Sequence, residues 1–238
     1  MKVMLISGGS RGIGAELVRY FSKQGYVVVF SYFKSEKIAL ELAKETGATC
    51  YFVDVSNSES VDNWIKQVLA TYRHIDNVVH CAGISNQALF HTLTDLQWHE
   101  MINTNLSSAF YICRKVLPSM IERKQGNILF ISSIWGQVGA SMEVHYSTAK
   151  AGLIGMTKAL AKEVAPSKIR VNCICPGVIQ TDMLNIYSLE DKLQLAQETP
   201  LGRIGVVSDI PPAVSFFLQE QSSFITGQVL SVDGGFAL

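Results

Sequence analysis

Short apolar runs alternate with amphipathic segments along the whole chain. Runs rich in valine, isoleucine and leucine predict buried strands at residues 3–7, 27–32, 49–53, 77–80, 126–131, 170–175 and 228–232. Apolar positions spaced three or four apart predict helices at residues 14–24, 36–45, 61–71, 94–118, 145–165, 189–198 and 213–218. We expect the helix from residue 94 to kink or end at Pro118, because proline has no amide hydrogen to donate. Ser35 and Gly47 are expected to cap the two ends of the second helix.

The alternation of strands and helices predicts the fold class. Strands that are almost continuously apolar are typical of parallel sheets covered on both faces, so we expect a single-domain, doubly wound, Rossmann-type α/β fold of about seven strands. No linker, repeat or low-complexity stretch divides residues 1–238. Within them, residues 177–205 are predicted to form a substrate loop or lid. Ligands of such sheets bind beyond the carboxyl ends of the strands, where the strand order reverses.

The charge balance argues against several classes of protein. The 238 residues include 20 Lys and Arg against 20 Asp and Glu, for a net charge of zero. Proteins that bind nucleic acid or membrane surfaces usually carry a basic excess, so neither partner is expected. No apolar stretch reaches the roughly 18 residues of a membrane span, and the first one is too short for a signal peptide, which favours a cytoplasmic protein. The charged fraction of 17% is below the typical ~25% and indicates that further surface is buried between subunits.

Cysteine and histidine spacings argue against a disulfide framework and a metal site. The five cysteines form no Cys-x-x-Cys pair, which together with their odd number favours buried, reduced thiols. Cys173 and Cys175 should face the same side of their strand. The five histidines form no His-x-x-x-His pair, so no metal is expected.

A glycine-rich stretch joins the first predicted strand to the first predicted helix. Gly8, Gly12 and Gly14 have the spacing Gly-x-x-x-Gly-x-Gly. Glycines there permit a tight turn and the close approach of a pyrophosphate, which the N–H groups and the positive dipole end of the helix attract. A glycine pattern alone also fits a turn that binds nothing. Its place at the first strand–helix junction favours a dinucleotide site.

The end of the second predicted strand indicates which dinucleotide is bound. Folds that prefer NAD place an acidic residue about 20 positions after the glycines, on the ribose 2′-hydroxyl. Here that position falls near Lys34, and no acid occurs before Glu36. Lys34, with Arg11 as a second cation and Ser10 and Ser35 as hydrogen-bond donors, suits a 2′-phosphate and favours NADP(H). The alternative is that Lys34 and Arg11 are merely solvated.

Small or polar residues end the third and fourth predicted strands. Asp54 can accept a hydrogen bond from an adenine amino group. Cys81, Ala82 and Gly83 are small enough for ribose and nicotinamide to pack against their backbone. Both sets lie at the edge where ligands of parallel sheets bind.

Tyr146 and Lys150 are four residues apart on a predicted helix and therefore share one face. A phenol ordinarily titrates near pH ~10, and an ammonium beside it should lower that pKa towards neutrality, where the phenol can act as an acid or base. Such a pair by itself is a common accident. Ser133 follows the fifth predicted strand and Asn105 lies on the long helix before it, so both can reach the same edge. Ser132 is an alternative to Ser133.

Together these motifs resemble the classical short-chain dehydrogenase/reductase family over essentially the whole chain. The matching residues are Gly8, Gly12, Ile13, Gly14, Asp54, Ala82, Gly83, Asn105, Ser133, Tyr146, Lys150, Asn172, Pro176 and Gly177. Within the family, 3-oxoacyl-(acyl-carrier-protein) reductases are the most similar, at residues 105–108, 146–155, 181–183, 225–228 and 232–235.

The resemblance implies a role for each residue. Tyr146 would protonate the carbonyl oxygen of the substrate as a hydride arrives from nicotinamide, and Ser133 would hydrogen-bond that oxygen. Lys150 would bind the nicotinamide ribose and tune Tyr146, while Asn105 would hold a water that connects Lys150 to solvent. Thr181 would contact the nicotinamide amide. The implied cofactor-binding set is Gly8, Ser10, Arg11, Gly12, Ile13, Gly14, Lys34, Asp54, Val55, Cys81, Ala82, Gly83, Tyr146, Lys150, Pro176, Gly177, Ile179 and Thr181.

Some residues depart from the family pattern. The family usually has asparagine where this chain has Cys81, and the loss of that amide is expected to loosen the loop while catalysis survives. Trp135, Met142, Glu143 and His145 are not the small residues common near the tyrosine in fatty-acid-pathway members. We expect them to line or border the substrate cleft, which leaves the acyl substrate open.

The implied reaction is NADPH-dependent reduction of a 3-oxoacyl thioester. Its carrier would be an acyl carrier protein or coenzyme A, and a polyketide-like or polyene chain is also open. The expected lid has the apolar residues Met183, Leu184, Ile186, Tyr187 and Leu189. An acidic carrier protein needs a basic docking site, for which Arg123, Lys124 and Lys168 are candidates. Ordinary surface charge explains these three residues equally well.

Two other functions stay open. A family member that acts on a sugar, a steroid or a small secondary alcohol would share these motifs. A non-catalytic NADP-binding regulator would be expected to lack part of the catalytic set, which is complete here. The resemblance also implies a homotetramer, with candidate interface residues that equally suit a core: Leu106, Phe110, Val116, Leu153, Met156, Leu160 and residues 236–238.

Overall fold

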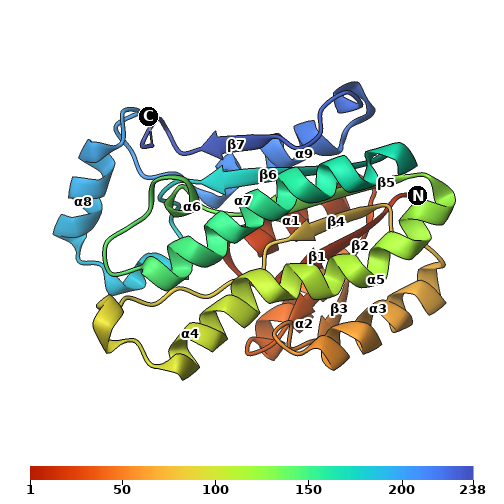
Figure 1. Cartoon of the computed structure of the whole chain (residues 1–238), viewed down its shortest axis with the longest axis horizontal. Coiled ribbons are helices and arrows are strands. Elements are labelled where there is room, and N and C mark those ends of the chain that lie inside the picture. The colour runs from red at the N-terminus through yellow and green to blue at the C-terminus, as the bar shows by residue number, and fades with distance from the viewer. Residues whose placement is uncertain (238) are drawn as a thin grey trace.

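A parallel β-sheet runs through the protein, whose computed structural model describes residues 1–237 apart from the side chain of Ile186 (Figure 1). Its strands are β1(Val3–Ser7), β2(Val27–Tyr32), β3(Thr49–Phe52), β4(Asn77–His80), β5(Gly126–Ile131), β6(Ile169–Pro176) and β7(Val229–Val232). Neighbouring strands are all parallel, in the order β3-β2-β1-β4-β5-β6-β7. The prediction of a single-domain, doubly wound α/β fold is confirmed.

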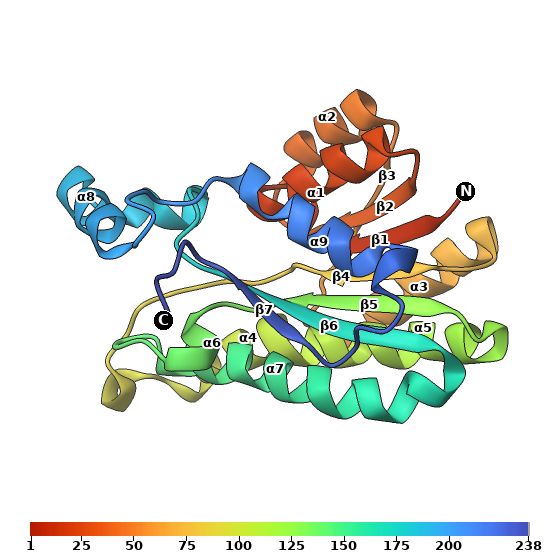
Figure 2. The same ribbon diagram turned by 90° about the horizontal axis from the view of Figure 1, so that it is seen from above.

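Helices cover both faces of the sheet. They are α1(Gly12–Lys23), α2(Glu36–Thr46), α3(Ser58–Tyr72), α4(Asp95–Ile102), α5(Ser108–Arg123), α6(Trp135–Val138), α7(Val144–Val164), α8(Leu189–Glu198) and α9(Pro211–Leu218). One face carries α1, α2 and α9, and the other carries α3, α5 and α7, as Figure 2 shows. The strands are therefore buried on both sides, which explains their almost continuous apolar sequence. In the same view α8 lies apart from both helix layers.

The sequence explains where several helices begin and end. Asn57 caps α3 by accepting a backbone N–H, and Thr94 and Gln97 form a capping box at the start of α4. Each such cap contributes about 1 kcal/mol. Gly47 ends α2 in the left-handed region, at φ 73°, as predicted. Ser35 precedes α2, but its ψ of 55° is not the extended conformation of a cap and its side chain makes no capping hydrogen bond, so that prediction is wrong.

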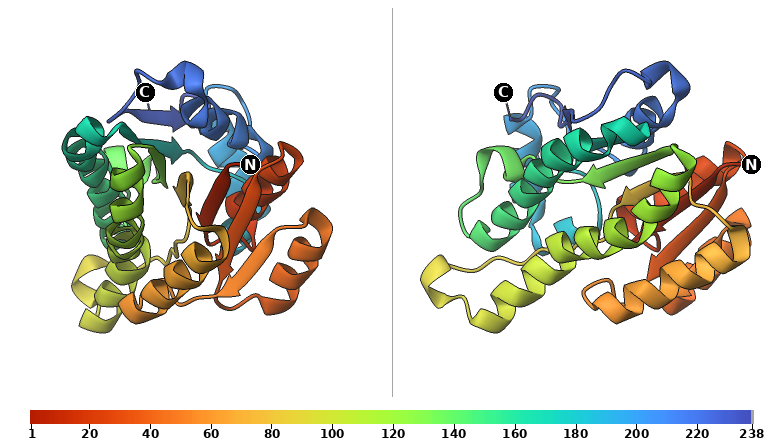
Figure 3. Two further views of the ribbon diagram at one scale, coloured as in Figure 1. Left: turned by 90° about the vertical axis from the view of Figure 1, so that its right-hand side faces the viewer. Right: turned by 45° about the vertical axis from the view of Figure 1, so that its right-hand side comes forward.

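The long helix expected from residue 94 is interrupted, though not at Pro118. It divides at Asn103–Ser107, a π-helical turn labelled η2, and α5 then continues through Pro118 to Arg123. In Figure 3, α4 and α5 follow one another along the same side of the molecule. Pro118 and Arg114, whose carbonyl loses its helical partner, are both exposed. Water can therefore satisfy that carbonyl, which is why the expected break at the proline is absent.

The fold determines where the cysteines and the apolar helices lie. Cys173 and Cys175 pack into the same cluster of buried side chains, as predicted, and all five thiols are unbridged. Among the described helices, none is long and apolar enough to cross a membrane. Within residues 1–237, no group of His, Cys, Asp and Glu side chains is arranged to hold a metal ion.

The strand order reverses between β1 and β4, because the chain adds strands first on one side of β1 and then on the other. Ser7 lies opposite His80 at this point. The carboxyl ends of all the strands face one edge of the sheet, on the left of Figure 1, where α6 and α8 also lie. Ligands of doubly wound sheets bind at this edge.

Candidate active site

A cavity of about 610 Å³ opens at the carboxyl ends of the strands, within the size range of cofactor and substrate sites. Its walls come from the loops after β1 to β6 and from α7. The catalytic and cofactor-binding residues expected from the sequence all line this cavity, namely Gly8, Ser10, Arg11, Gly12, Ile13, Gly14, Lys34, Asp54, Val55, Cys81, Ala82, Gly83, Asn105, Ser133, Tyr146, Lys150, Pro176, Gly177, Ile179 and Thr181.

The glycine loop forms one wall and leaves no room for side chains. A Cβ atom on Gly8, whose φ is 68°, would lie 2.7 Å from the Cα of Ala82, and one on Gly14 would overlap the Gly8 carbonyl oxygen. Both positions therefore require glycine. α1 begins at Gly12 without a side-chain cap, and its first residues line the cavity. The N–H groups and the positive dipole end of α1 thus form an anion site.

The residues after β2 extend this wall. Phe33, Lys34 and Ser35 line the cavity, and Lys34 is exposed. The nearest acid, Glu36, lies outside the lining and accepts a hydrogen bond from the Tyr32 hydroxyl at 3.5 Å. Among the described residues, no carboxylate occupies the place where NAD-preferring folds hold the ribose. Phe33, which the sequence analysis did not select, had no signal other than its position beside Lys34.

Arg11 connects the glycine loop to the loop after β6. Its guanidinium pairs with the Asp182 carboxylate at 3.3 Å, and both side chains are exposed. Next to this pair, Thr181 packs against the backbone of Gly12. An exposed ion pair contributes little stability, so Arg11 remains available to exchange Asp182 for a phosphate.

Asp54 is fixed by the turn that follows β3. Its Oδ1 accepts hydrogen bonds from the Ser56 N–H at 2.9 Å and the Ser56 hydroxyl at 2.6 Å. Its own N–H donates to Ser60 Oγ at 3.1 Å. These bonds hold the carboxylate beside Val55 at the cavity wall, with Oδ2 as the oxygen available to a ligand.

Buried hydrogen bonds hold the loop after β4. Ser7 Oγ accepts from the N–H groups of Cys81 and Ala82, at 3.1 and 3.2 Å, and lies 2.8 Å from His80 Nδ1. The other ring nitrogen of His80 lies 3.2 Å from Ser108 Oγ. That Cys81 loosens this loop stays a prediction, and the hydrogen bonds of Ser7 and His80 hold the loop without an amide side chain at Cys81.

Asn105 is fully buried in η2 and ties this turn to the same loop. Its Nδ2 donates to the carbonyl oxygens of Ile84 and Met101, both at 3.0 Å, and its Oδ1 accepts the Ile84 N–H at 3.1 Å. Both amide hydrogens are thus used within the protein. That Asn105 holds a water for Lys150 stays a prediction, for which a second lone pair on Oδ1 remains.

Tyr146 and Lys150 lie one turn apart on α7, and both are buried in the wall of the cavity. Lys150 Nζ lies 5.6 Å from the centre of the Tyr146 ring and donates to the Ile131 carbonyl at 3.0 Å. The carboxyl end of β5 therefore positions the ammonium beside the phenol.

Ser132 and Ser133 follow β5 and have different partners. Ser133 Oγ accepts the Trp135 N–H at 3.2 Å, and its hydroxyl hydrogen remains available to the cavity. Ser132 Oγ instead donates to the backbone carbonyl of Lys150 at 2.8 Å, which holds α7 against the strand. The structure thus favours Ser133 over Ser132 as the hydroxyl beside Tyr146.

Burial dominates the acidity of the Tyr146 and Lys150 pair. It raises the pKa of the phenol well above its usual value and lowers the pKa of the ammonium. Hydrogen bonding by Ser133 lowers the pKa of the phenol, and the Glu143 carboxylate raises it. Burial outweighs the effect of the Lys150 ammonium, so the expectation that the pKa of Tyr146 falls towards neutrality is wrong for this arrangement. The phenol is protonated at neutral pH, which is the form that a proton donor needs.

The wall opposite the glycine loop is mainly apolar. Its side chains include Trp135, Met183, Leu184, Tyr187 and Leu195. Glu143 is the acid beside them; it is 6% exposed, and burial raises its pKa. The Tyr187 hydroxyl accepts a hydrogen bond from Gln87 Nε2 at 2.8 Å, which connects the loop after β6 to the loop after β4.

Two residues expected at the cleft lie outside its lining. His145 is fully buried and hydrogen-bonds Asn86, because it points from α7 towards the loop after β4. Met142 is exposed, and its carbonyl oxygen accepts the Ala88 N–H. Of the four residues expected to line or border the cleft, Trp135 and Glu143 are therefore the two that face the cavity.

The basic residues expected to dock a carrier protein lie away from the cavity. Arg123, Lys124 and Lys168 precede β5 and β6, at the amino ends of the strands, whereas the cavity lies at the carboxyl ends. Arg123 is also held by Asp76 Oδ1 at 3.1 Å and by the Ile75 carbonyl at 2.7 Å. These three residues do not form a docking site at the mouth of the cavity.

The candidate interface residues divide into two groups. Val116 and Leu153 are fully buried in the core of this chain, so they are not available to another subunit. Phe110 is exposed on α5. Phe236 packs edge-on against Trp135 with ring centres 5.6 Å apart, and Leu238 lies outside the described residues.

Comparisons with known proteins cover nearly the whole chain. A family model described as enoyl-(acyl carrier protein) reductase matches residues 8–237. The chain is 43% identical over 241 residues to the 3-oxoacyl-(acyl-carrier-protein) reductase FabG of Chlamydia trachomatis, covering 99% of this chain and 97% of that protein. It is 40% identical to the acetoacetyl-CoA reductase of Shinella zoogloeoides, covering 98% of each. A solved structure of a Serratia marcescens short-chain dehydrogenase/reductase variant superposes with a TM-score of 0.93 at 28% identity, covering 100% of this chain and 98% of that one.

These similarities are not confined to the glycine loop, which many unrelated nucleotide-binding folds share. They extend over 98–100% of the chain, which includes the helix that bears Tyr146 and Lys150. Because the match extends over all the elements that build the cavity, the protein is an oxidoreductase of CH–OH and C=O groups and belongs to the short-chain dehydrogenase/reductase family.

Proposed function

We propose that the protein reduces the 3-oxo group of an acyl thioester to a 3-hydroxyl group, with NADPH as the hydride donor. The observation that carries this proposal is the convergence of Tyr146, Ser133 and Lys150 on one cavity with the glycine loop. Relatives named as 3-oxoacyl-(acyl-carrier-protein) reductase and acetoacetyl-CoA reductase support the substrate class. Both names describe 3-oxoacyl thioesters, which differ in the carrier.

The cavity fits a phosphorylated dinucleotide. The uncapped N-terminus of α1 and the close backbone approach at Gly8 and Gly14 suit a pyrophosphate. Lys34 and Arg11 suit a 2′-phosphate, because both are cations and the acid that follows β2, Glu36, lies outside the cavity lining. The Oδ2 atom of Asp54 suits the adenine amino group. When bound, NADPH supplies the hydride that reduces the carbonyl carbon.

The side chains of α7 and β5 supply the proton and stabilise the oxygen. Tyr146, which burial keeps protonated, donates its phenolic proton to the carbonyl oxygen while the carbon receives the hydride. The Ser133 hydroxyl donates a hydrogen bond to the same oxygen and stabilises the negative charge that develops there. The Lys150 ammonium stabilises the phenolate that remains on Tyr146. Solvent then returns a proton to the phenolate, for which a water at Asn105 is the proposed route.

The loop at residues 177–205 is the proposed lid over the acyl chain. Its apolar lining residues Met183, Leu184 and Tyr187 suit a hydrocarbon chain better than a sugar. We favour an acyl carrier protein over coenzyme A as the carrier, with a partner surface other than Arg123, Lys124 and Lys168. The second candidate is reduction of another ketone, for which the same proton donor and cofactor would serve.

The family resemblance also supports a homotetramer. Exposed aromatic residues Phe110 on α5 and Phe224 before β7 are available to other subunits. We propose that these faces are covered in the assembly. Light scattering coupled to size-exclusion chromatography measures the mass, and a monomer at micromolar concentration would contradict the proposal.

The test is oxidation of NADPH, followed by its absorbance, with acetoacetyl-CoA and with a 3-oxoacyl carrier protein. NADH is measured in parallel. Turnover with both thioesters, faster for the carrier protein and at least about tenfold faster with NADPH than with NADH, is the expected result. Tight NADPH binding without turnover of either thioester would overturn the substrate and leave the cofactor assignment in place.

A further inference from the structure

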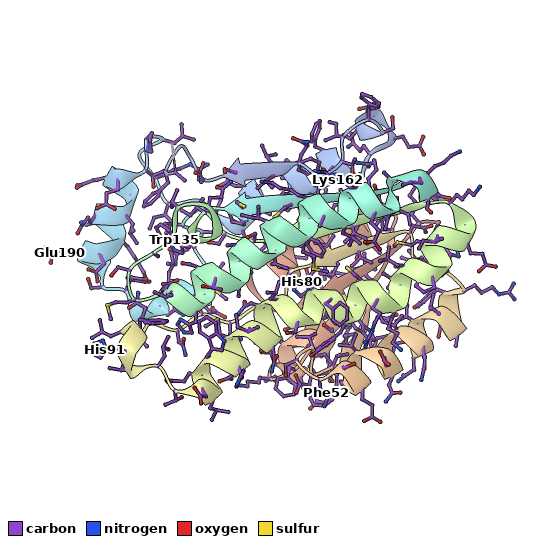
Figure 4. All side chains as sticks on the ribbon, viewed as in Figure 1. Phe52, His80, His91, Trp135, Lys162 and Glu190 are labelled. Carbon is purple, nitrogen blue, oxygen red and sulfur yellow. The ribbon has the colours of Figure 1, made fainter. Side chains whose placement is uncertain are left out.

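His80 is a buried polar residue at the point where the strand order reverses. It ends β4 and lies opposite Ser7 of β1 in the sheet. Its side chain is almost inaccessible to solvent, and Figure 4 labels it in the interior behind α5 and α7. A buried imidazole destabilises a protein unless its ring nitrogens are hydrogen-bonded. Both nitrogens of His80 have partners.

The hydrogen bonds around the ring assign a single tautomer. Ser108 Oγ donates its only hydrogen to the Thr104 carbonyl, 2.6 Å away, so the hydrogen between Ser108 Oγ and His80 must lie on Nε2. On the other side, Ser7 Oγ accepts two backbone N–H groups from the next loop. Its own hydrogen therefore points to His80 Nδ1. The ring is neutral and carries its hydrogen on Nε2.

A charged ring is incompatible with this network. A second ring hydrogen, on Nδ1, would face a Ser7 hydroxyl whose lone pairs already accept two N–H groups. Burial and then the nearby Lys150 ammonium lower the pKa of His80 to about 3. At neutral pH His80 is thus a neutral connector and not an acid, a base or a metal ligand.

The hydrogen bonds connect His80, η2 and the loop after β4 in a closed ring. From His80 one branch runs through Ser7 to the N–H groups of the loop that begins at Cys81. The other runs through Ser108 to Thr104 in η2. Asn105, the next residue in η2, returns to that same loop through its hydrogen bonds with Ile84.

We propose that His80 is a positioning residue, which holds η2 and the loop after β4 in fixed relation to the glycine loop. His80 does not line the cavity, so it acts through Asn105 and through the backbone of the loop. The inference rests on the proposed reductase function, because its consequences are measured as NADPH binding and turnover. Loss of the Ser108 branch should affect mainly turnover, and loss of the Ser7 branch mainly cofactor binding.

Two variants separate the two branches. Ser108→Ala removes the connection to η2 and leaves the ring and Ser7 in place. It is expected to lower kcat for acetoacetyl-CoA at saturating NADPH by roughly tenfold, with the Kd for NADPH within about twofold of the wild type. His80→Leu removes both branches and is expected to lower kcat and to weaken NADPH binding. His80→Asn, which places an amide oxygen near the position of Nδ1, should recover most of the lost NADPH affinity.

Cys113→Ala is the matched control, because Cys113 is also buried on α5 but lies outside the network. It should lower the melting temperature without lowering kcat by more than about twofold. A Ser108→Ala protein with wild-type kcat would overturn the inference, as would equal loss of kcat in Cys113→Ala. Equal NADPH affinity in His80→Leu and His80→Asn would overturn the Ser7 branch. If the wild type binds NADPH but does not reduce acetoacetyl-CoA, the proposed substrate fails, and the binding comparison still tests His80.

Discussion

The two walls of the cavity are built by different means. On the side of the glycine loop, buried hydrogen bonds connect β1, β4, η2 and α7. On the opposite side, the loop after β6 presents apolar side chains to the cavity, of which Met183 is 49% exposed. Under the proposed function, the chemistry of the reaction therefore depends on the fold itself, whereas the choice of substrate depends on a few surface side chains.

The two walls also differ in the free energy of unfolding that a substitution is expected to cost. Removing one partner from a buried hydrogen bond costs about 1–3 kcal/mol, because the remaining group is left without water. An exposed side chain can usually be replaced within about 0.5 kcal/mol. The apolar wall formed by the loop after β6 can thus change its shape without loss of folding stability. The wall on the side of the glycine loop cannot, because its hydrogen bonds are buried. Each prediction below tests one side of this contrast.

The largest effect is expected from Tyr146→Phe, which removes the proton donor and little else. We expect kcat for acetoacetyl-CoA to fall by about 10²–10⁴-fold. The Kd for NADPH, measured by titration calorimetry, should stay close to that of the wild type. Full reductase activity in this variant would contradict the mechanism, since Tyr146 is the phenol that lies one helical turn from Lys150 in the cavity wall.

The second-largest effect is expected from Lys34→Glu, which tests whether the residues after β2 recognise a phosphate. Lys34→Glu should lower the ratio of kcat/KM for NADPH to that for NADH by roughly 10–100-fold, because a charge-assisted hydrogen bond contributes about 1.5–3 kcal/mol. Lys37→Glu is the control, since Lys37 is exposed on α2 and lies outside the cavity lining. An equal change in both variants would indicate general electrostatics and not a phosphate site.

Glu143→Gln tests whether a residue beside the apolar wall influences the pKa of Tyr146 on α7. Ionised Glu143 raises the pKa of Tyr146, because a nearby carboxylate disfavours the phenolate. Oxidation of a 3-hydroxyacyl thioester needs the phenolate and rises with pH, whereas reduction needs the phenol and falls as pH rises. The variant should therefore shift both limbs of the pH profile to lower pH, by less than about one unit.

The control for this shift is Glu190→Gln, since Glu190 lies on the exposed helix α8 (Figure 4). Its pH profile should match that of the wild type. A Glu143→Gln profile that moves to higher pH, or that does not move at all, would show that the carboxyl of Glu143 does not influence Tyr146.

The smallest effect is expected from Met183→Ala, in the exposed loop after β6. Its free energy of unfolding should change by no more than about 0.5 kcal/mol, and kcat for acetoacetyl-CoA should stay within about threefold of the wild type. Longer 3-oxoacyl substrates should show the change instead, as a higher KM. A loss of about 1–3 kcal/mol, the cost of an unpaired buried hydrogen-bonding group, would contradict the contrast between the two walls.

Much of the fold is predictable because its signals are local. The strands at residues 3–7, 27–32, 77–80 and 126–131 have the predicted bounds, since each is a continuous apolar run that glycine or polar residues end. Residues such as Gly8, Asp54 and Ser133 could be selected because they follow such strands, and parallel strands bring their carboxyl ends together. Their meeting in one cavity follows from topology alone.

The features that could not be predicted depend on distant partners. Ser7 and His80 are 73 positions apart, and nothing in their local sequence indicates that they hydrogen-bond. The pKa of Tyr146 depends on burial, which spacing on a helix does not reveal. The same holds for Arg11 and Asp182, which are 171 positions apart, and for Arg123, whose partners on the segment before β4 are visible only in three dimensions.

The surplus residue of η2 sets the rotational phase between α4 and α5. A π-helical turn contains one residue more than the α-helical ladder allows, and each helical residue turns the side-chain direction by about 100°. Met101 before the turn and Met120 after it are 19 positions apart, which would separate them by about 100° around a regular helix, yet both are fully buried. A one-residue deletion within 103–107 would therefore keep these two side chains on one side of a regular helix but would remove the widened turn that holds Asn105 at the cavity. The surplus residue is thus absorbed within a single turn, so that the rod gains a polar side chain at the cavity without turning its buried side outward.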